Sequence, residues 1–322
     1  MKFSHIPIMT KEILSFFKPK YSGQYLFVDA TLGGGGHSKK ILESIPNSKI
    51  IGIDQDQEAI KAAKDNLAGF KSKVTFINEN FSKISEILAT LNIQKIDGIL
   101  FDLGVSSYQL ENPERGFSFS ESKKNINSKL DMRMDKNQRL SAQEVLNNYS
   151  EKQLIKIFFE YGEEQYSKQI AREIIKFRDT KRIQTTKNLL EIIKKSTPPK
   201  YRYKKREGHY ASKIFRAIRM EVNQELKSLE IALKDSIKYL KKDSRIVVIT
   251  FHSLEDRLVK NIFQKYENPC TCPPEFPVCV CNKKPIIKII TKKSIQPSDL
   301  ETMKNPKARS AQIRIAQKII DE

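Results

Sequence analysis

Four short apolar runs alternate with helical patterns through the first hundred residues, and this alternation constrains the fold more than any other feature. The runs are YLFVDA (25–30), KIIGID (49–54), VTFIN (74–78) and IDGILFDL (96–103). The segments between them that are predicted as helices are 37–45, 57–68 and 82–91. Runs that are apolar on both faces are typical of buried parallel strands. The pattern therefore predicts β–α–β units in a parallel sheet covered by helices.

The alternation breaks off after the fourth run. Residues 106–208 show no strand pattern, and a polar loop is followed there by helical segments. Three apolar residues recur at helical spacing in one of these segments, namely Ile170, Ile174 and Phe177. Such spacing predicts a helix with one buried face. We therefore expect a helical insert over 106–208 that interrupts an α/β domain made of residues 1–105 and 209–322.

The alternation resumes beyond the insert. A long helical stretch is predicted at about 211–241, followed by the strand RIVVITF (245–251). Two later runs, PIIKIITKK (285–293) and SAQIRIAQKI (310–319), alternate with period two. They predict an antiparallel pair at the edge of the sheet.

A run of four glycines, Gly33 to Gly36, follows the first strand directly within VDATLGGGGHSKK (28–40). The turn from a first strand into a helix is where open parallel sheets bind their ligands. A tight turn alone would also account for the run. The match to the dinucleotide motif G-x-G-x-x-G is partial, because Ser38 stands at the third glycine position. The run therefore indicates a ligand site without identifying the ligand.

Three carboxylates, Asp29, Asp54 and Asp102, each end a predicted strand, so we expect them at one edge of the sheet. Any one of them could instead cap a helix. Together they would form a poor binding site for a pyrophosphate and a good one for a ligand with ribose hydroxyls, an ammonium group and a sulfonium cation. Asp54, about twenty residues past the glycines, is placed to accept both ribose hydroxyls. The pattern favours S-adenosylmethionine over NAD.

The formal net charge of +20 favours a polyanionic partner, nucleic acid first and an anionic membrane second. Residues 181–220 contain thirteen Lys and Arg against two Glu, a net charge of +11. Within them KYRYKKREGHY (200–210) interleaves Tyr201, Tyr203 and Tyr210 with cations. Cations beside exposed rings suit single-stranded nucleic acid. The alternative is a solvated lysine-rich loop.

The cysteines are confined to CTCPPEFPVCVC, in the order Cys270, Cys272, Cys279 and Cys281. This confinement favours a small zinc knuckle. The C-x-C spacing and the lack of a nearby histidine favour a proline-stiffened loop instead. We expect a cytoplasmic protein, because no signal segment or membrane-length apolar run is present, and disulfides are disfavoured there. Metal binding stays open.

Ten motifs, in order along nearly the whole chain, resemble the bacterial 16S ribosomal RNA cytosine-N4 methyltransferases, the RsmH or MraW family. They include DATLGGGGHS (29–38), GIDQDQEAI (52–60), DGILFDLGVSSYQL (97–110), FRAIRMEVNQEL (215–226) and NPKARSAQIR (305–314). The resemblance implies an α/β fold, a class I (Rossmann-like) methyltransferase sheet with a helical insert domain after strand four. It also implies S-adenosyl-L-methionine as methyl donor and the exocyclic N4 of a decoding-centre cytidine as target.

The same resemblance implies seven cofactor contacts, namely Gly35, Gly36, His37, Asp54, Phe81, Asp102 and Gln109. The groups that face the target base are expected at the ends of strands four and five, and the candidates are Asp102, Ser106, Ser107 and His252. DNA amino-methyltransferases have an acidic or polar residue followed by Pro-Pro-aromatic at strand four, where this chain has DLGVSSY. Ser253 and Asp256 are also predicted as a helix N-cap pair.

The expected partner is 16S ribosomal RNA or the small ribosomal subunit, and not a membrane. The helical insert is expected to bind this RNA. The oligomeric state stays open, with a homodimer as one candidate. Two other functions remain as alternatives: an NAD-dependent oxidoreductase, which the broken glycine motif disfavours, and a non-catalytic RNA-binding or assembly factor with a relic pocket.

Overall fold

The computed structural model describes residues 7–17, 22–118, 127–203, 209–273, 275, 278 and 280–321. The chain divides into two compact units. The first, the sheet unit, comprises Met1–Gly104 and Leu226–Glu322, and the second, the helical unit, comprises Val105–Glu225. The helical unit thus ends at Glu225 and not at residue 208, because the helix α11 (Ser212–Val222) buries its apolar residues in the core of this unit.

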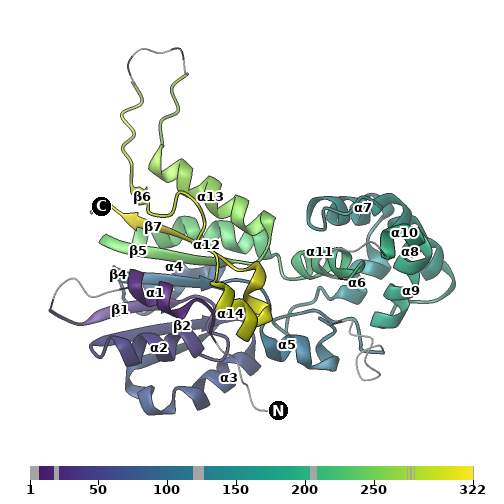
Figure 1. Cartoon of the computed structure of the whole chain (residues 1–322), viewed down its shortest axis with the longest axis horizontal. Coiled ribbons are helices and arrows are strands. Elements are labelled where there is room, and N and C mark those ends of the chain that lie inside the picture. The colour runs from purple at the N-terminus through teal and green to yellow at the C-terminus, as the bar shows by residue number, and fades with distance from the viewer. Residues whose placement is uncertain are drawn as a thin grey trace. The chain divides into compact units, whose positions relative to one another are not determined.

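The sheet unit is built on seven strands in the order β3-β2-β1-β4-β5-β7-β6 (Figure 1). The strands are β1 (Tyr25–Asp29), β2 (Ser48–Asp54), β3 (Val74–Asn78), β4 (Ile96–Asp102), β5 (Leu240–Thr250), β6 (Ile287–Ile289) and β7 (Gln312–Lys318). Strands β1 to β5 are parallel, and β7 is antiparallel to both β5 and β6. The predicted strands and the antiparallel pair are confirmed, with β6 as the edge strand.

Helices cover both faces of this sheet, as Figure 1 shows. One face carries α1 (Thr10–Phe16), α2 (Gly36–Ser44) and α3 (Gln57–Asn66). The other carries α4 (Ile84–Thr90), α12 (Glu225–Tyr239) and α13 (Ser253–Glu267). A further helix, α14 (Asp299–Lys304), precedes β7. Strand β4 is buried from Ile96 to Phe101, as expected of a strand with helices on both sides. This architecture agrees with the class I (Rossmann-like) methyltransferase sheet that the resemblance implies.

The strand order reverses next to β1. From β1 the chain moves outward through β2 and β3, and it then returns to place β4 on the other side of β1. In open α/β sheets, ligands bind outside the carboxyl ends of the strands at such a reversal. The ends of β2, β1 and β4 are therefore the place to look for a site.

The helical unit contains α5 (Ser107–Glu111), α6 (Ala142–Asn148), α7 (Glu151–Glu160), α8 (Ser167–Thr180), α9 (Thr186–Ser196), α10 (Pro199–Arg202) and α11. Its described residues form no strand, only one isolated bridge between Lys129 and Thr185. Helix α8 buries Ile170 and Ile174, which confirms the predicted face. None of the helices described in the two units is long and apolar enough to span a membrane.

The helical stretch predicted at about 211–241 is not continuous. Helix α11 ends before Asn223, and Gln224 adopts a left-handed backbone with φ of 49°. The Asn223 side chain explains the break, because its Nδ2 donates to the Met132 carbonyl and its Oδ1 accepts from the Met134 amide, both at 2.8 Å. These bonds tie the break to a distant loop, which no local sequence pattern reveals.

Candidate functional site

Asp54 lies at the carboxyl end of β2 and accepts two backbone hydrogen bonds. Gly33 N donates to Oδ2 at 2.8 Å and Asp56 N donates to Oδ1 at 2.9 Å. Burial raises the pKa of the Asp54 carboxyl from 3.8 to about 7, although these two bonds oppose the shift. A carboxylate has about four acceptor sites. Asp54 can therefore accept two further donors from a ligand.

Two glycines of the run serve different purposes. Gly35 has φ of 75°, and a Cβ there would lie 2.8 Å from Leu67 Cδ1, so the protein's own packing requires this glycine. Gly33 has φ of 50°, and the nearest atom to a Cβ there is the Thr31 carbonyl oxygen at 3.9 Å. Open space therefore lies beside Gly33, next to the amide that orients Asp54. Gly33 was not among the predicted contacts, although it belongs to the same run.

Asp29, at the end of β1, is engaged within the protein. Ser38 Oγ donates to its Oδ2 at 2.6 Å, and Thr31 N donates to its Oδ1 at 3.3 Å. The residue is 2% exposed, and burial raises the pKa of its carboxyl. Asp29 therefore fixes the glycine loop on the sheet. This role differs from the expected one, in which its carboxylate belongs to the ligand-binding site.

The buried His37 and the partly buried Asp102 form a pair at the same edge of the sheet. His37, in the first turn of α2, is 7% exposed, and its Nε2 lies 3.4 Å from Asp102 Oδ2. The backbone amide of Asp102 donates to Thr31 Oγ1 at 2.6 Å, which ties the end of β4 to the glycine loop. Among the described residues, neither ring nitrogen of His37 nor Asp102 Oδ1 has a hydrogen-bond partner. Buried polar atoms of this kind call for a partner, and a ligand would provide one.

Phe81 follows β3 and borders the same edge. Its ring meets Phe101 edge to face, with centroids 5.8 Å apart. Asn80 caps the turn that holds Phe81, accepting from Ser82 N at 2.9 Å, and donates to Gln55 Oε1 at 2.7 Å. Neither Asn80 nor Gln55 was predicted. The signal for Asn80 was its place two residues after a strand and directly before a helical turn, where Asn is a preferred N-cap.

Ser106 and Gln109 belong to the helical unit, where they bind each other. Gln109 N donates to Ser106 Oγ at 3.2 Å, and Ser106 N donates to Gln109 Oε1 at 3.0 Å. This reciprocal capping box begins α5. The side chain of Ser107 lies outside the described part of the structure. Ser106 therefore has a structural task of its own.

His252 is the N-cap of α13, so the prediction that Ser253 and Asp256 form the cap is wrong. His252 Nδ1 accepts from Glu255 N at 3.4 Å, and its Nε2 lies 3.0 Å from Glu255 Oε1. Asp256 instead receives two bonds from Arg314, at 2.6 and 2.8 Å. This bidentate pair joins α13 to β7, a long-range contact that local spacing does not indicate.

The three tyrosines of the basic segment differ in exposure. Tyr201 is buried, donates its hydroxyl to the Glu164 carboxylate and stacks edge to face on Tyr166, with centroids 4.8 Å apart. The prediction of Tyr201 as a base-stacking ring is therefore wrong. Tyr210 is partly buried against the core of the helical unit. Tyr203 is 80% exposed and is available to a ligand.

The cations of the basic segment also fall into two groups. Arg216 and Arg219 are engaged internally, with the Gly162 carbonyl and the Glu225 carboxylate. Exposed cations surround α9, namely Lys181, Arg182, Lys187, Lys194, Lys195 and Lys200, and three of them also form ion pairs, Arg182 with Glu144, Lys187 with Glu191 and Lys195 with Glu173. Residues 204–208, with Lys204, Lys205 and Arg206, lie outside the described residues. We call the six exposed residues the α9 basic cluster.

The chain matches the model of the MraW methylase family over residues 2–319. It is 51% identical over 320 residues to a protein of Clostridium botulinum named ribosomal RNA small subunit methyltransferase H, covering 99% of this chain and 100% of the relative. Proteins of the same name from Carboxydothermus hydrogenoformans and Finegoldia magna are 49% and 48% identical to this chain. Each alignment covers 99% of this chain, and the two alignments cover 99% and 100% of the respective relatives.

The likeness to solved structures is more distant. A putative methyltransferase from Streptococcus mutans, solved with SAH, aligns over 98% of this chain and 100% of its own length. The TM-score is 0.44 and the identity is 9%, so this likeness bears no weight beside the sequence match.

Proposed function

Because the chain belongs to the MraW methylase family, we propose that it transfers a methyl group from S-adenosyl-L-methionine to the exocyclic N4 of a cytidine in the decoding centre of 16S ribosomal RNA. Its relatives are named ribosomal RNA small subunit methyltransferases, at about half identity over the whole chain. The observation that carries the proposal is the sheet edge at β2, β1 and β4. There the Asp54 carboxylate, the open backbone at Gly33 and the unsatisfied His37–Asp102 pair occur together.

The residues of this edge fit S-adenosyl-L-methionine. Asp54 accepts the two ribose hydroxyls, for which its carboxylate keeps acceptor capacity. The open backbone at Gly33 gives the amino-acid part and the sugar room to approach. Phe81 offers a ring against adenine, and the buried polar atoms of His37 and Asp102 gain partners. The other implied contacts are Gly35, Gly36 and Gln109.

The bound cofactor supplies an electrophilic methyl group on a sulfonium, which the amine attacks in line. The protein has to hold N4 collinear with the methyl–sulfur bond and to accept hydrogen bonds from the amine. Asp102 is the first candidate acceptor, because its Oδ1 is buried without a partner among the described residues. As a carboxylate it can also take the proton that the amine loses after transfer. Ser106, Ser107 and His252 are the further candidates for positioning the base.

Cysteine chemistry distinguishes N4 from C5 methylation. Enzymes that methylate C5 of cytosine attack C6 with a thiolate, because C5 is a poor nucleophile. All four cysteines of this chain lie in residues 270–281, after α13. None of them lies in the segments that directly follow β1, β2 or β4, whose ends form the candidate site. The exocyclic nitrogen needs no covalent activation. The chain is therefore suited to methylation of the exocyclic N4 and not of C5.

The helical unit binds the RNA in this proposal. The α9 basic cluster and Tyr203 supply phosphate contacts and a stacking ring. A paired or stacked cytidine has to be extruded before its N4 reaches a cofactor, and backbone contacts hold the strand while this happens. The family match gives no support to the homodimer that was one candidate assembly.

The test is methylation of small ribosomal subunits that lack the mark. We expect label from methyl-labelled S-adenosyl-L-methionine to enter 16S RNA, and mass spectrometry of the nucleosides to give N4-methylcytidine. Naked RNA and assembled subunits are assayed in parallel. Label on carbon 5, or in a base other than cytosine, contradicts the proposed target. Binding of NADH without binding of S-adenosylhomocysteine contradicts the proposed cofactor.

A further inference from the structure

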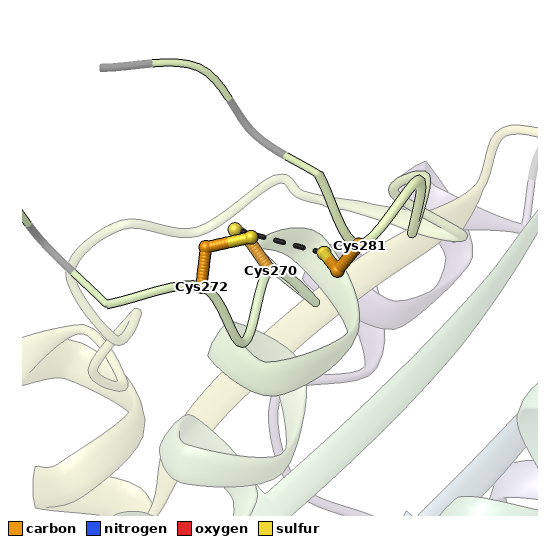
Figure 2. A group of neighbouring side chains, drawn as sticks. All are labelled: Cys270, Cys272 and Cys281. Carbon is orange, nitrogen blue, oxygen red and sulfur yellow. Dashed lines mark hydrogen bonds between the residues drawn. The ribbon is translucent and has the colours of Figure 1, made fainter. Parts of the chain in front are cut away.

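We propose that Cys270, Cys272 and Cys281 bind a structural zinc ion through their thiolates. Helix α13 and strand β6 are joined by residues 268–286, the metal loop, which carries these cysteines. Cys270 and Cys272 lie on the limb that leaves α13, and Cys281 lies on the limb that returns to β6 (Figure 2). The fourth cysteine, Cys279, lies outside the described residues and is not part of the argument.

The sulfur positions are compatible with a zinc–thiolate centre. The ligand atoms of the three cysteines all lie within 4.8 Å of one another, and Cys270 Sγ is 3.8 Å from Cys281 Sγ. Tetrahedral zinc with Zn–S bonds of about 2.3 Å places its sulfurs about 3.8 Å apart. A disulfide would need the two sulfurs at about 2.05 Å. The distance between Cys270 and Cys281 therefore suits two ligands of one ion and not a disulfide, and the Cys272 sulfur lies within 4.8 Å of both.

The described residues of the metal loop form no hydrophobic core that could order it. None of its described residues is buried, and Val278 and Val280 are 70% and 64% exposed. Structureless loops of this length are uncommon in compact domains unless something fixes or uses them. Small segments that cannot bury apolar surface are often held by a metal. A zinc ion that links the two limbs would supply this order.

Polar contacts around the sulfurs agree with a thiolate site. The backbone amide of Val280 donates to Cys272 Sγ at 3.4 Å, as amides do around metal-bound thiolates. Lys283 on the returning limb donates to Thr271 Oγ1 on the outgoing limb at 3.2 Å. The lysine also places a positive charge next to the cysteines, which offsets the negative charge of three thiolates. Binding releases the three thiol protons to solvent.

The test measures metal in the full-length protein purified under reducing conditions without chelator. We expect about one zinc ion per chain by elemental mass spectrometry, as in structural sites of this kind. Replacing Cys270, Cys272 and Cys281 singly by serine should each lower the zinc content at least tenfold after dialysis. The matched control is Val278→Ser in the same loop, which should keep the zinc. Circular dichroism verifies that each variant is folded.

If a serine variant does not fold, cobalt substitution of the unaltered protein decides. Thiolate-to-cobalt charge-transfer bands and tetrahedral d–d bands support the site, and their absence overturns it. Iron in place of zinc, no metal at all, or a Cys270–Cys281 disulfide in the reduced preparation also overturns it. None of these measurements depends on methyl transfer, so the zinc proposal and the proposed function can fail separately.

Discussion

The sheet unit carries 32 basic and 22 acidic side chains, and the helical unit carries 26 and 16, so each has a formal net charge of +10. The two units nevertheless present their charges differently. In the sheet unit the informative groups are carboxylates at strand ends, where burial raises the pKa of Asp29 and Asp54. In the helical unit they are exposed lysines around α9. Net charge alone therefore does not locate a function; burial and the partners of each charge do.

Asp54→Ala should give the largest effect, and it should be confined to the cofactor. Each hydrogen bond to a charged group is worth about 1.5–3 kcal/mol, so losing both ribose bonds should raise the dissociation constant of S-adenosylhomocysteine more than about a hundredfold. RNA affinity should not change. Calorimetry and an RNA-binding assay measure the two quantities.

The control for this variant is Asp56→Ala. Asp56 caps α3 through its side chain, and its backbone amide, which supports Asp54, remains in the variant. It should lose about 1 kcal/mol of stability and keep its cofactor affinity within a few-fold. Unchanged affinity in Asp54→Ala would remove Asp54 from the site.

The sheet unit was largely predictable from the sequence because its signals are local. Strand and helix periods are properties of neighbouring residues, and parallel strand ends must meet at one edge. Asp54 and Asp102 could therefore be assigned to that edge from their positions at the ends of apolar runs. The cap at His252 was missed although it is local, since His252 Nδ1 accepts from Glu255 N three residues on. The bond between Asp256 and Arg314 could not be predicted, because its partners are far apart in the sequence.

The helical unit was less predictable because charge does not reveal partners. Tyr201 and Tyr203 are two residues apart in the same basic segment, yet one is buried on Glu164 and the other is exposed. Arg219 adds to the local count of cations but pairs with Glu225. A count of cations therefore overstates the surface that is available to RNA.

Charge reversal on α9 should give the second largest effect, and it should be confined to RNA. Replacing Lys187, Lys194 and Lys195 by glutamate should weaken binding about tenfold to a hundredfold and make the salt dependence shallower, since each phosphate contact adds about −0.7 to −0.9 to the log–log slope. Affinity for S-adenosylhomocysteine should be retained. Fluorescence anisotropy over a series of salt concentrations measures the slope.

The matched control reverses Lys61, Lys64 and Lys71, which are exposed on the sheet unit. If both triple variants weaken RNA binding equally, total charge matters and not the α9 basic cluster. That result would contradict the proposal that the helical unit binds the RNA while the sheet unit binds the cofactor.

Cofactor binding should depend on pH through Asp54. The pKa of the Asp54 carboxyl is about 7 in the folded protein, and its ordinary value is 3.8. The protonated form therefore contributes to folding stability below about pH 4. This contribution is lost as pH rises from about 4 through 7, because ionisation of the buried carboxyl opposes folding. Ribose hydroxyls prefer the ionised form. The affinity for S-adenosylhomocysteine should therefore fall about tenfold for each pH unit below 7.

Asp54→Asn is the control for the pH profile. Its amide does not titrate, so affinity should be lower than in the unaltered protein and flat between about pH 5 and 8. A profile that keeps its slope in Asp54→Asn would assign the titration to another group.

The smallest effects should come from the two tyrosines, and each should change a different property. Tyr203→Ala removes an exposed ring, so RNA affinity should fall about fivefold, the lower end of base stacking at about 1 kcal/mol, with no change in thermal stability. Tyr201→Phe removes the hydroxyl bonded to the buried Glu164 carboxylate, so stability should fall by about 1–3 kcal/mol with RNA affinity unchanged. Urea unfolding and anisotropy on both variants give the comparison. If Tyr203→Ala unfolds more readily and binds RNA normally, its ring packs within the helical unit as that of Tyr201 does, and lysines alone would contact the RNA.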